Sequence, residues 1–294
     1  MITEIICGNC EEILRNLKNK FKDCIHLTFL DPPFNQDKEY EKFDDNMPAD
    51  EYWGFIRRVI NEIYEITAEG GAIYFMQREK NTKYVLEILE ECGWTFQNLI
   101  IWKKLTSAVP GKFRFGKQYQ IIAFATKGEK PRVFNRLRID LPTPPHYKYD
   151  RKNGVYVTDI WNDIREMTSG YLAGKEAIRL NDGTRAHKQQ SPVHLLLRII
   201  LSSTNPGDMV LDPFAGSGTT SVVAKQLNRN SISIEIDPKY VNLIKQRLEK
   251  LREGDDISKY YHYYRYTQNL DKIWGVEYQT KSVSKQKDII TFFK

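Results

Sequence analysis

The chain has 294 residues, of which 41% are hydrophobic and 28% are charged, and its formal net charge is +6. This is the composition of a globular protein with a large core, and it excludes a fibrous or largely disordered chain. No apolar run approaches the roughly 20 residues needed to span a bilayer, and the N-terminus lacks the basic start of a signal peptide. We therefore expect a cytoplasmic protein.

The first part of the chain alternates predicted strands and helices. Ile25–Leu30 is an apolar run of β-preferring residues, typical of a buried strand. An amphipathic helix is predicted at 50–67, ended by Gly70-Gly71, and a second helix at 81–92. Further strands are predicted at 72–76, 99–102 and 121–125.

The same alternation returns at Pro192 in the last third of the chain. Helices are predicted at 193–204, 219–227 and 237–252, and they are separated by strands at 209–211 and 231–236. Strands that alternate with helices favour an α/β fold with a doubly wound, mostly parallel sheet.

Residues 130–186 interrupt this alternation. Prolines cluster there and no long apolar period survives, which indicates a small irregular domain or long functional loops. Positive charge gathers in the same part of the chain, because 103–152 holds thirteen Lys or Arg residues and three acids. That surplus suits phosphate neutralisation, although a solvated surface explains such a charge run equally well.

Two other features leave alternatives open. Cys7, Cys10, Cys24 and His26 have a spacing that could form a zinc site, but buried cysteines are commoner, so we expect no metal. The tail at 255–294 is rich in Tyr and Lys, which suits a nucleic-acid or protein interface or a segment packed across the core.

A glycine turn lies between the predicted strand and helix at 212–220. Its sequence is Asp-Pro-Phe-Ala-Gly-Ser-Gly-Thr-Thr, and Glu235 ends the next strand. Glycines allow close approach of a ligand, and a carboxylate at the second position accepts hydrogen bonds from ribose hydroxyls, so an adenosine-containing cofactor is indicated. The carboxylate of Asp212 attracts a sulfonium or ammonium and repels a pyrophosphate, which favours S-adenosylmethionine over a nicotinamide dinucleotide.

The sequence Asp31-Pro32-Pro33-Phe34 follows the predicted strand Ile25–Leu30. An exocyclic base amine is a poor nucleophile, and two acceptors aimed at its N–H bonds would localise its lone pair. The Asp31 carboxylate and the Pro32 carbonyl could be those acceptors. Phe34 could stack on a base that has left the duplex. An ordinary turn at the end of a strand is the simpler interpretation of these four residues alone.

Taken together, these motifs resemble the amino-methyltransferases of DNA, in the permuted class that places the catalytic tetrapeptide before the cofactor loop. The resemblance covers roughly 4–128 and 186–250. It is carried by five segments, namely 30–35, 101–103, 187–193, 205–220 and 231–240, together with a shorter match at 8–10. The segment 187–193 has Lys188 and Ser191 where the family more often has Pro and Lys, and Asn9 stands where Asp is commoner.

The resemblance implies a role for each matched residue. The catalytic residues would be Asp31, Pro32, Pro33 and Phe34. The cofactor S-adenosylmethionine would be held by Gly8, Asn9, Cys10, Asp31, Gln190, Ser191, Asp212, Phe214, Ala215, Gly216, Ser217, Gly218, Thr219, Glu235 and Asp237. Duplex DNA would be contacted by Lys112, Arg114, Lys117, Arg132, Arg136 and Arg138.

The resemblance also implies the domain organisation and the reaction. A catalytic domain would comprise 1–128 and 186–254, overlapping a target-recognition region at 104–185, with 255–294 as a tail. Asp at the start of the tetrapeptide favours the N6 amine of adenine. Methylation of the cytosine N4 amine is the first alternative, and a nicotinamide-dependent oxidoreductase or a non-catalytic DNA-binding protein are the others. A cognate restriction endonuclease and a homodimer are left open as partners.

Overall fold

The computed structural model describes 1–38, 42–106, 109–141, 146, 148, 151–167, 174–180, 182–187 and 189–275. The first half contains β1 (Thr3–Cys7), α1 (Cys10–Phe21), β2 (Ile25–Leu30), α2 (Ala49–Ile66), β3 (Thr67–Arg78), α3 (Thr82–Glu91), β4 (Trp94–Lys103) and β5 (Tyr119–Lys127). The second half contains β6 (Arg138–Ile139), β7 (Val155–Tyr156), β8 (Ile160–Trp161), α4 (Val193–Ser203), β9 (Met209–Asp212), α5 (Thr219–Gln226), β10 (Asn230–Glu235), α6 (Pro238–Glu249) and α7 (Leu270–Trp274).

Eight strands form one sheet in the order β1-β10-β9-β2-β3-β5-β4-β8. Most neighbours are parallel, but β5 runs antiparallel to both β3 and β4. The predicted α/β fold with a mostly parallel sheet is confirmed. β2 pairs in parallel with β9, although the two strands are far apart in sequence. The carboxyl ends of β2 and β9 therefore lie side by side, whichever half of the chain comes first.

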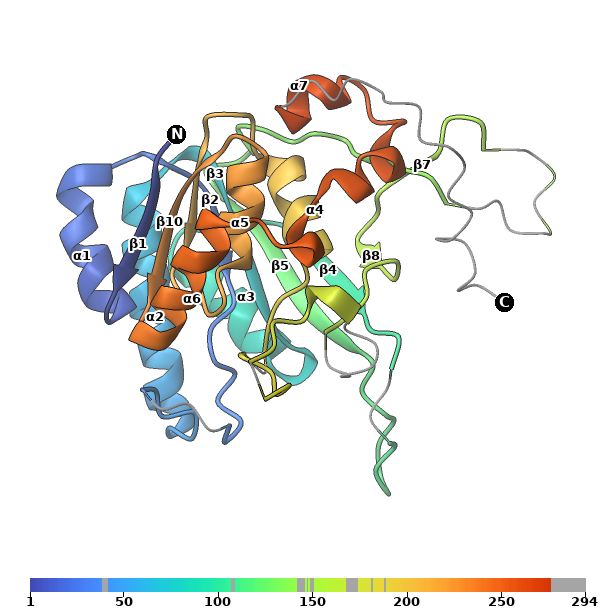
Figure 1. Cartoon of the computed structure of the whole chain (residues 1–294). Helices are drawn as coiled ribbons and strands as arrows, with labels where there is room; N and C mark the ends of the chain where they lie inside the picture. The colour runs from blue at the N-terminus through green and yellow to red at the C-terminus, as the bar shows by residue number, and fades with distance from the viewer. Residues whose placement is uncertain are drawn as a thin grey trace.

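Helices cover both faces of the sheet, as Figure 1 shows. Along β3, Ala72, Tyr74 and Met76 face the core that contains α4 and α5, whereas Ile73 and Phe75 face the core that contains α1, α2 and α3. This alternation is the period of two that a strand buried on both faces must have.

The role of Gly70 and the start of β3 differ from the sequence prediction. Helix α2 ends at Ile66, and Gly70 lies inside β3 rather than ending the helix. Gly70 has φ +72, and a Cβ there would lie 2.7 Å from the Arg132 backbone nitrogen, which donates a hydrogen bond to the Gly70 carbonyl. The glycine therefore permits the close approach of the segment around Arg132.

The zinc alternative is not supported. Cys7 ends β1, whereas Cys24 precedes β2. Because β1, β10, β9 and β2 all run parallel, the end of β1 and the start of β2 lie at opposite edges of the sheet, and so do the two thiols. His26 Nδ1 accepts a hydrogen bond of 2.9 Å from the Met209 backbone. Among the described residues, no three His, Cys, Asp or Glu side chains are grouped so that they could hold a metal ion.

The described part of the tail packs across the core, one of the two alternatives open for it. Tyr264 is fully buried against α4, and its hydroxyl is 2.9 Å from His194 Nε2 and 3.1 Å from Arg198 Nε. Arg198 also pairs with Asp163. Every residue of α4 is buried as a result. Residues 276–294 lie outside the described residues, and none of the helices that are described is long and apolar enough to cross a membrane.

Candidate active site

Asp31 and Asp212 meet at the edge of the sheet where parallel strands β2 and β9 end. Asp31 is the first residue after β2, and Asp212 is the last residue of β9. Ligands of doubly wound sheets bind beyond the carboxyl ends of the strands. The structure thus brings together the two sequence motifs that contain Asp31 and Asp212, although they are far apart along the chain.

A cavity of about 1620 Å³ opens at this edge. It is lined by Asp31, Pro32, Pro33 and Phe34 and by all but one of the predicted cofactor residues. The exception is Gly218, which has φ +78 before α5 and where a Cβ would lie 2.6 Å from Ile244. Gly218 therefore allows the turn into α5 to pack against α6, and it does not line the cavity.

The Asp31 carboxyl is half-buried and held from one side. The Ser191 hydroxyl donates a hydrogen bond of 3.0 Å to Asp31 Oδ2. Burial raises the pKa of Asp31 to about 7, and the neighbouring charge of Asp212 acts in the same direction. The Ser191 hydrogen bond and the positive charges of Lys104 and Lys38 oppose this rise in pKa.

The Pro33 carbonyl is held by groups on α2 and β3. The Tyr52 hydroxyl donates a hydrogen bond of 2.6 Å to the Pro33 carbonyl, and Gln77 Nε2 donates one of 2.9 Å to the Tyr52 oxygen. In the described part of the chain, no hydrogen bond is formed to the Pro32 carbonyl. The Pro32 oxygen is therefore available as the second acceptor that the amine chemistry needs.

The glycine loop is bound to the carboxylate that ends β10. Glu235 Oε2 accepts a hydrogen bond of 2.7 Å from the Gly216 backbone, and Oε1 accepts one of 2.9 Å from the Asp237 backbone. A carboxylate has about four acceptor positions, so Glu235 can still accept hydrogen bonds from a ligand in the cavity. Burial raises the pKa of Glu235.

Asp212 is held by its own loop. Its Oδ1 accepts a hydrogen bond of 3.1 Å from the Phe214 backbone, and its Oδ2 accepts one of 2.5 Å from the Thr220 hydroxyl. Burial raises the pKa of Asp212 to about 7. Two carboxyls with raised pKa values favour a cationic ligand, because a positive charge between them would offset the unfavourable burial of their ionised forms.

The N-terminal residues approach the same cavity from β1. The Gly8 backbone donates a hydrogen bond of 3.0 Å to the Glu235 carbonyl, and Asn9 Oδ1 accepts one of 2.9 Å from the Glu11 backbone. The Asn9 side chain therefore caps α1, which explains why Asn serves where Asp is commoner. Cys10 is buried, and burial raises the pKa of its thiol to about 12.

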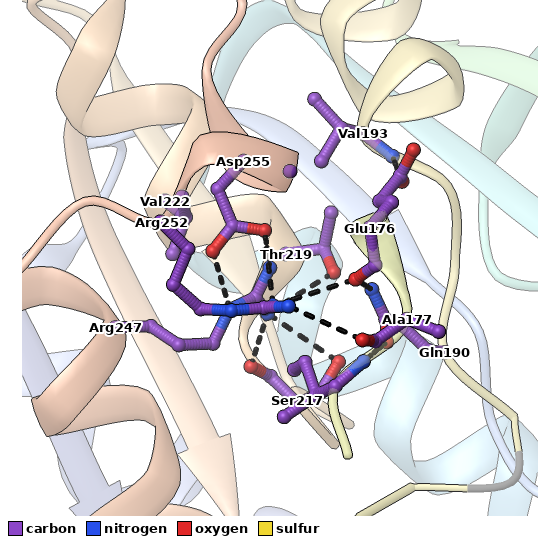
Figure 2. A network of polar contacts seen from close by, with 12 residues as sticks. Glu176, Ala177, Gln190, Val193, Ser217, Thr219, Val222, Arg247, Arg252 and Asp255 are labelled. Carbon is purple, nitrogen blue, oxygen red and sulfur yellow. Dashed lines mark hydrogen bonds and ion pairs between the residues drawn. The ribbon is translucent and has the colours of Figure 1, made fainter. Parts of the chain in front are cut away.

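A network of polar contacts, which the sequence did not predict, holds the glycine loop in place (Figure 2). The buried Arg247 of α6 pairs with Asp255 at 2.7 Å and donates hydrogen bonds to the Ser217 carbonyl and the Thr219 hydroxyl. Arg252 donates to the carbonyl of Ala177 at 3.2 Å. Nothing in the sequence marks these arginines, because the partners of Arg247 and Arg252 are set by tertiary packing.

Gln190 belongs to the same network. Its Oε1 accepts a hydrogen bond of 3.2 Å from the Ile178 backbone, and its Nε2 donates one of 3.0 Å to the Glu176 carbonyl. The Glu176 carboxylate in turn accepts a hydrogen bond from the Val193 backbone at the start of α4. The Gln190 amide thus ties the segment before α4 to 174–178, and Ser191 is held next to Asp31.

The six predicted DNA-contacting residues fall into two groups. Lys112, Arg114 and Lys117 lie between β4 and β5, where Lys117 pairs with Glu79 at 2.6 Å. The other three are Arg132, Arg136 and Arg138, and they lie elsewhere in the fold.

Each arginine of the second group is held by a contact within the protein. Arg132 pairs with Asp208, which precedes β9, so Arg132 lies at the opposite edge of the sheet from Asp31. Arg136 and Arg138 lie over the ring of Tyr156 in β7, with guanidinium carbons 4.5 and 4.3 Å from its centroid. Figure 1 places β7 at the end of the molecule away from the segment between β4 and β5.

Two lysines that the sequence analysis did not select also line the cavity. Lys38 and Lys104 lie near Asp31, and burial lowers the pKa of both. Lys104 Nζ is 5.5 Å from the ring centroid of Trp102, whose Nε1 donates a hydrogen bond of 2.8 Å to the Ile164 carbonyl. Trp102 and Phe34 therefore give the Asp31 side of the cavity two aromatic walls.

Comparison with known proteins places this arrangement in a family. Residues 25–246 match the profile of the N6/N4 methyltransferases, described as DNA methylase. The type II methyltransferase M.HpaI of Haemophilus parainfluenzae is 33% identical over 258 residues, which cover 87% of this chain and 77% of that protein. The DNA adenine methyltransferase YhdJ of Escherichia coli (strain K12) is 30% identical over 251 residues, which cover 81% of each.

Two solved structures share the fold. The M1.HpyAVI–SAM complex has a TM-score of 0.58 and 24% identity, with coverage of 85% of this chain and 100% of that one. The cytosine-N4-specific PvuII DNA methyltransferase has a TM-score of 0.62 and 18% identity, with coverage of 94% of each chain. With a family match that spans most of the chain and a cavity built from the same motifs, this protein belongs to the N6/N4 DNA methylase family.

Proposed function

We propose that this DNA amino-methyltransferase transfers a methyl group from S-adenosylmethionine to the N6 amine of adenine in duplex DNA. The observation that carries the proposal is the position of Asp31. It is a half-buried carboxyl that lines the cavity together with Asp212 and Lys104, at the edge where β2 and β9 end.

The residues of the cavity fit S-adenosylmethionine. The Glu235 carboxylate, with acceptor positions to spare, suits the two ribose hydroxyls. The Asp212 carboxyl suits the cationic amino-acid end, because burial raises its pKa and a neighbouring positive charge would stabilise its ionised form. When bound, this cofactor supplies an already activated methyl group on a sulfonium, so no metal or acid is needed to make it reactive.

The chain's own residues then prepare the amine. The Asp31 carboxylate and the Pro32 carbonyl accept hydrogen bonds from the two N–H bonds and draw the nitrogen toward tetrahedral geometry. Ser191 fixes the Asp31 carboxylate, and Tyr52 fixes the neighbouring Pro33 carbonyl. Phe34 and Trp102 provide the aromatic surfaces for a base that has left the duplex.

Adenine is favoured over cytosine because the tetrapeptide begins with Asp. Relatives named for adenine methylation, such as YhdJ, support the same assignment. The type II relatives support the proposal that this enzyme acts together with a cognate restriction endonuclease. Methylation would then protect the DNA from cleavage by that endonuclease. We propose that the region 104–185 reads the target and that Lys112, Arg114 and Lys117 contact phosphates.

Mass analysis of nucleosides tests the proposal. DNA from a methylation-free bacterial strain is incubated with S-adenosylmethionine and either the wild-type chain or Asp31→Ala, then digested to nucleosides. N6-methyladenine from the wild type and none from the variant is the expected result. N4-methylcytosine without N6-methyladenine would overturn the choice of base. Tight binding of NADH without binding of S-adenosylhomocysteine would overturn the methyltransferase assignment.

A further inference from the structure

The segment between β4 and β5 carries the most exposed aromatic side chains of the described residues. Phe113 is 90% exposed and Phe115 is 96% exposed, and Val109 beside them is 89% exposed. Figure 1 shows this green segment projecting from the body at the end of the sheet where β4 ends and β5 begins. Such an apolar projection is unfavourable in water and marks an interaction surface.

The base of this segment is fixed, although its tip is exposed. The Lys104 backbone donates a hydrogen bond of 2.7 Å to the Gln118 carbonyl and so pairs the two arms. The Glu166 carboxylate accepts hydrogen bonds of 2.9 and 3.0 Å from the backbones of Leu105 and Thr106. The base of the segment is therefore fixed beside the cavity, which Lys104 and Glu166 both line.

The tip combines its aromatic rings with positive charge. Lys112 and Arg114 flank Phe113, and Lys112 Nζ lies 5.4 Å from the centroid of the Phe113 ring. A bridge between Gly111 and Arg114 turns the chain at this point. The interval 109–118 contains no Asp or Glu. Cations beside exposed rings fit a partner that offers both phosphates and stacked bases, namely duplex DNA.

The geometry points to a stacking role for Phe113 and Phe115: they insert into the duplex next to the target nucleotide and hold open the space that the base leaves on entering the cavity. This inference rests on the proposed function, because it needs a base that leaves the helix. Removing a base from the stack costs a few kcal/mol, and apolar wedges between base steps offset such unstacking. Lys112 and Arg114 would contact the flanking phosphates.

The methylation site is first mapped on bacterial DNA. The test then compares two duplexes that contain this site. In one, the target base is paired; in the other, it lies opposite an abasic site and leaves the helix more easily. Single-turnover methylation is measured for the wild type, for the double variant Phe113→Ala/Phe115→Ala and for Phe113→Tyr/Phe115→Tyr. Phe96→Ala is the matched control, since Phe96 is also exposed but lies near the opposite end of β4.

The double alanine variant should methylate the paired duplex about ten- to a hundredfold more slowly than the wild type, which is the scale of lost aromatic stacking. It should recover most of that loss on the abasic duplex and bind S-adenosylhomocysteine normally. The tyrosine variant and Phe96→Ala should resemble the wild type. Equal rates for the alanine variant and the wild type on the paired duplex would overturn the stacking role, as would an equal loss on both duplexes. A wild-type chain that methylates no DNA would instead refute the proposed function.

Discussion

The Ser191 hydroxyl donates a hydrogen bond to Asp31 Oδ2 across 3.0 Å, and this bond joins the segment before α4 to the carboxylate after β2. It connects two sequence motifs that lie 160 positions apart. Ser191 stands where the family more often has Lys, so the Asp31 carboxylate is held by a neutral donor. Ser191, expected at the cofactor, also lines the cavity, so it can position Asp31, contact the cofactor, or do both.

Ser191→Ala should slow methyl transfer while leaving cofactor affinity nearly unchanged. A hydrogen bond to a charged group contributes about 1.5–3 kcal/mol, which corresponds to a loss of roughly ten- to a hundredfold in kcat. Ser191→Thr keeps the hydroxyl and should recover most of the rate. Single-turnover methylation and calorimetry with S-adenosylhomocysteine measure the two effects separately. If Ser191→Ala loses cofactor affinity but keeps its rate of methyl transfer, then Ser191 binds the cofactor and does not position Asp31.

Asp212→Asn should increase the stability of the cofactor-free protein at pH 8. The increase should be smaller at pH 5. Burial raises the folded-state pKa of Asp212 from 3.8 to about 7. Above pH 7 the folded protein carries an unfavourable buried charge, and as pH falls through 7 toward 4 the carboxyl becomes neutral and this destabilisation disappears. Thermal unfolding of the wild type and the variant at both pH values measures the difference. A gain in Tm that is larger at pH 5 than at pH 8 would contradict this explanation.

Glu235→Ala should weaken binding of S-adenosylhomocysteine by about 1–3 kcal/mol, the loss expected for hydrogen bonds to a charged group. Glu235→Gln keeps one acceptor oxygen, so it should lose less affinity. Calorimetry on the three proteins gives the comparison. Unchanged affinity in Glu235→Ala would show that the ribose lies elsewhere in the cavity.

Arg247→Met should destabilise the protein by about 3–5 kcal/mol, because it leaves the buried carboxylate of Asp255 without its partner. It should also weaken cofactor binding, since Arg247 holds the Ser217 carbonyl of the glycine loop. The combined change Arg247→Met/Asp255→Asn removes both charges and should recover part of the stability but not the cofactor affinity. Chemical denaturation together with calorimetry separates the two effects; full recovery of affinity in the combined variant would contradict the role given to Arg247.

Local patterns predicted the central strands and helices and the main motifs well, but not β1 and α1. Ile25–Leu30 and Met209–Asp212 are short apolar strands followed by distinctive turns, and their meeting at one edge follows from parallel pairing. The start of β3 was placed too late, because Gly70 lies inside the strand and serves a contact with Arg132 that is remote in sequence. Arg247 could not be found for the same reason, since its partners belong to other elements.

The positions of the basic residues in the fold were the least predictable part. A count of positive charge in 103–152 cannot tell Lys112, on the exposed segment, from Arg132, which is paired with Asp208 at the far edge of the sheet. The exposed rings of Phe113 and Phe115 also gave no signal, because a sequence shows an apolar residue but not whether the fold covers it.

The role of Asp31 is tested most directly by Asp31→Asn, which keeps the shape of the side chain but replaces one acceptor oxygen with a donor. Single-turnover transfer from labelled S-adenosylmethionine to duplex DNA is measured at saturating cofactor, with cofactor affinity measured in parallel. We expect a loss of at least about a hundredfold in rate, the scale of one lost transition-state hydrogen bond in a preorganised site, with cofactor affinity changed only a few-fold. An unchanged rate in Asp31→Asn would contradict this role of Asp31.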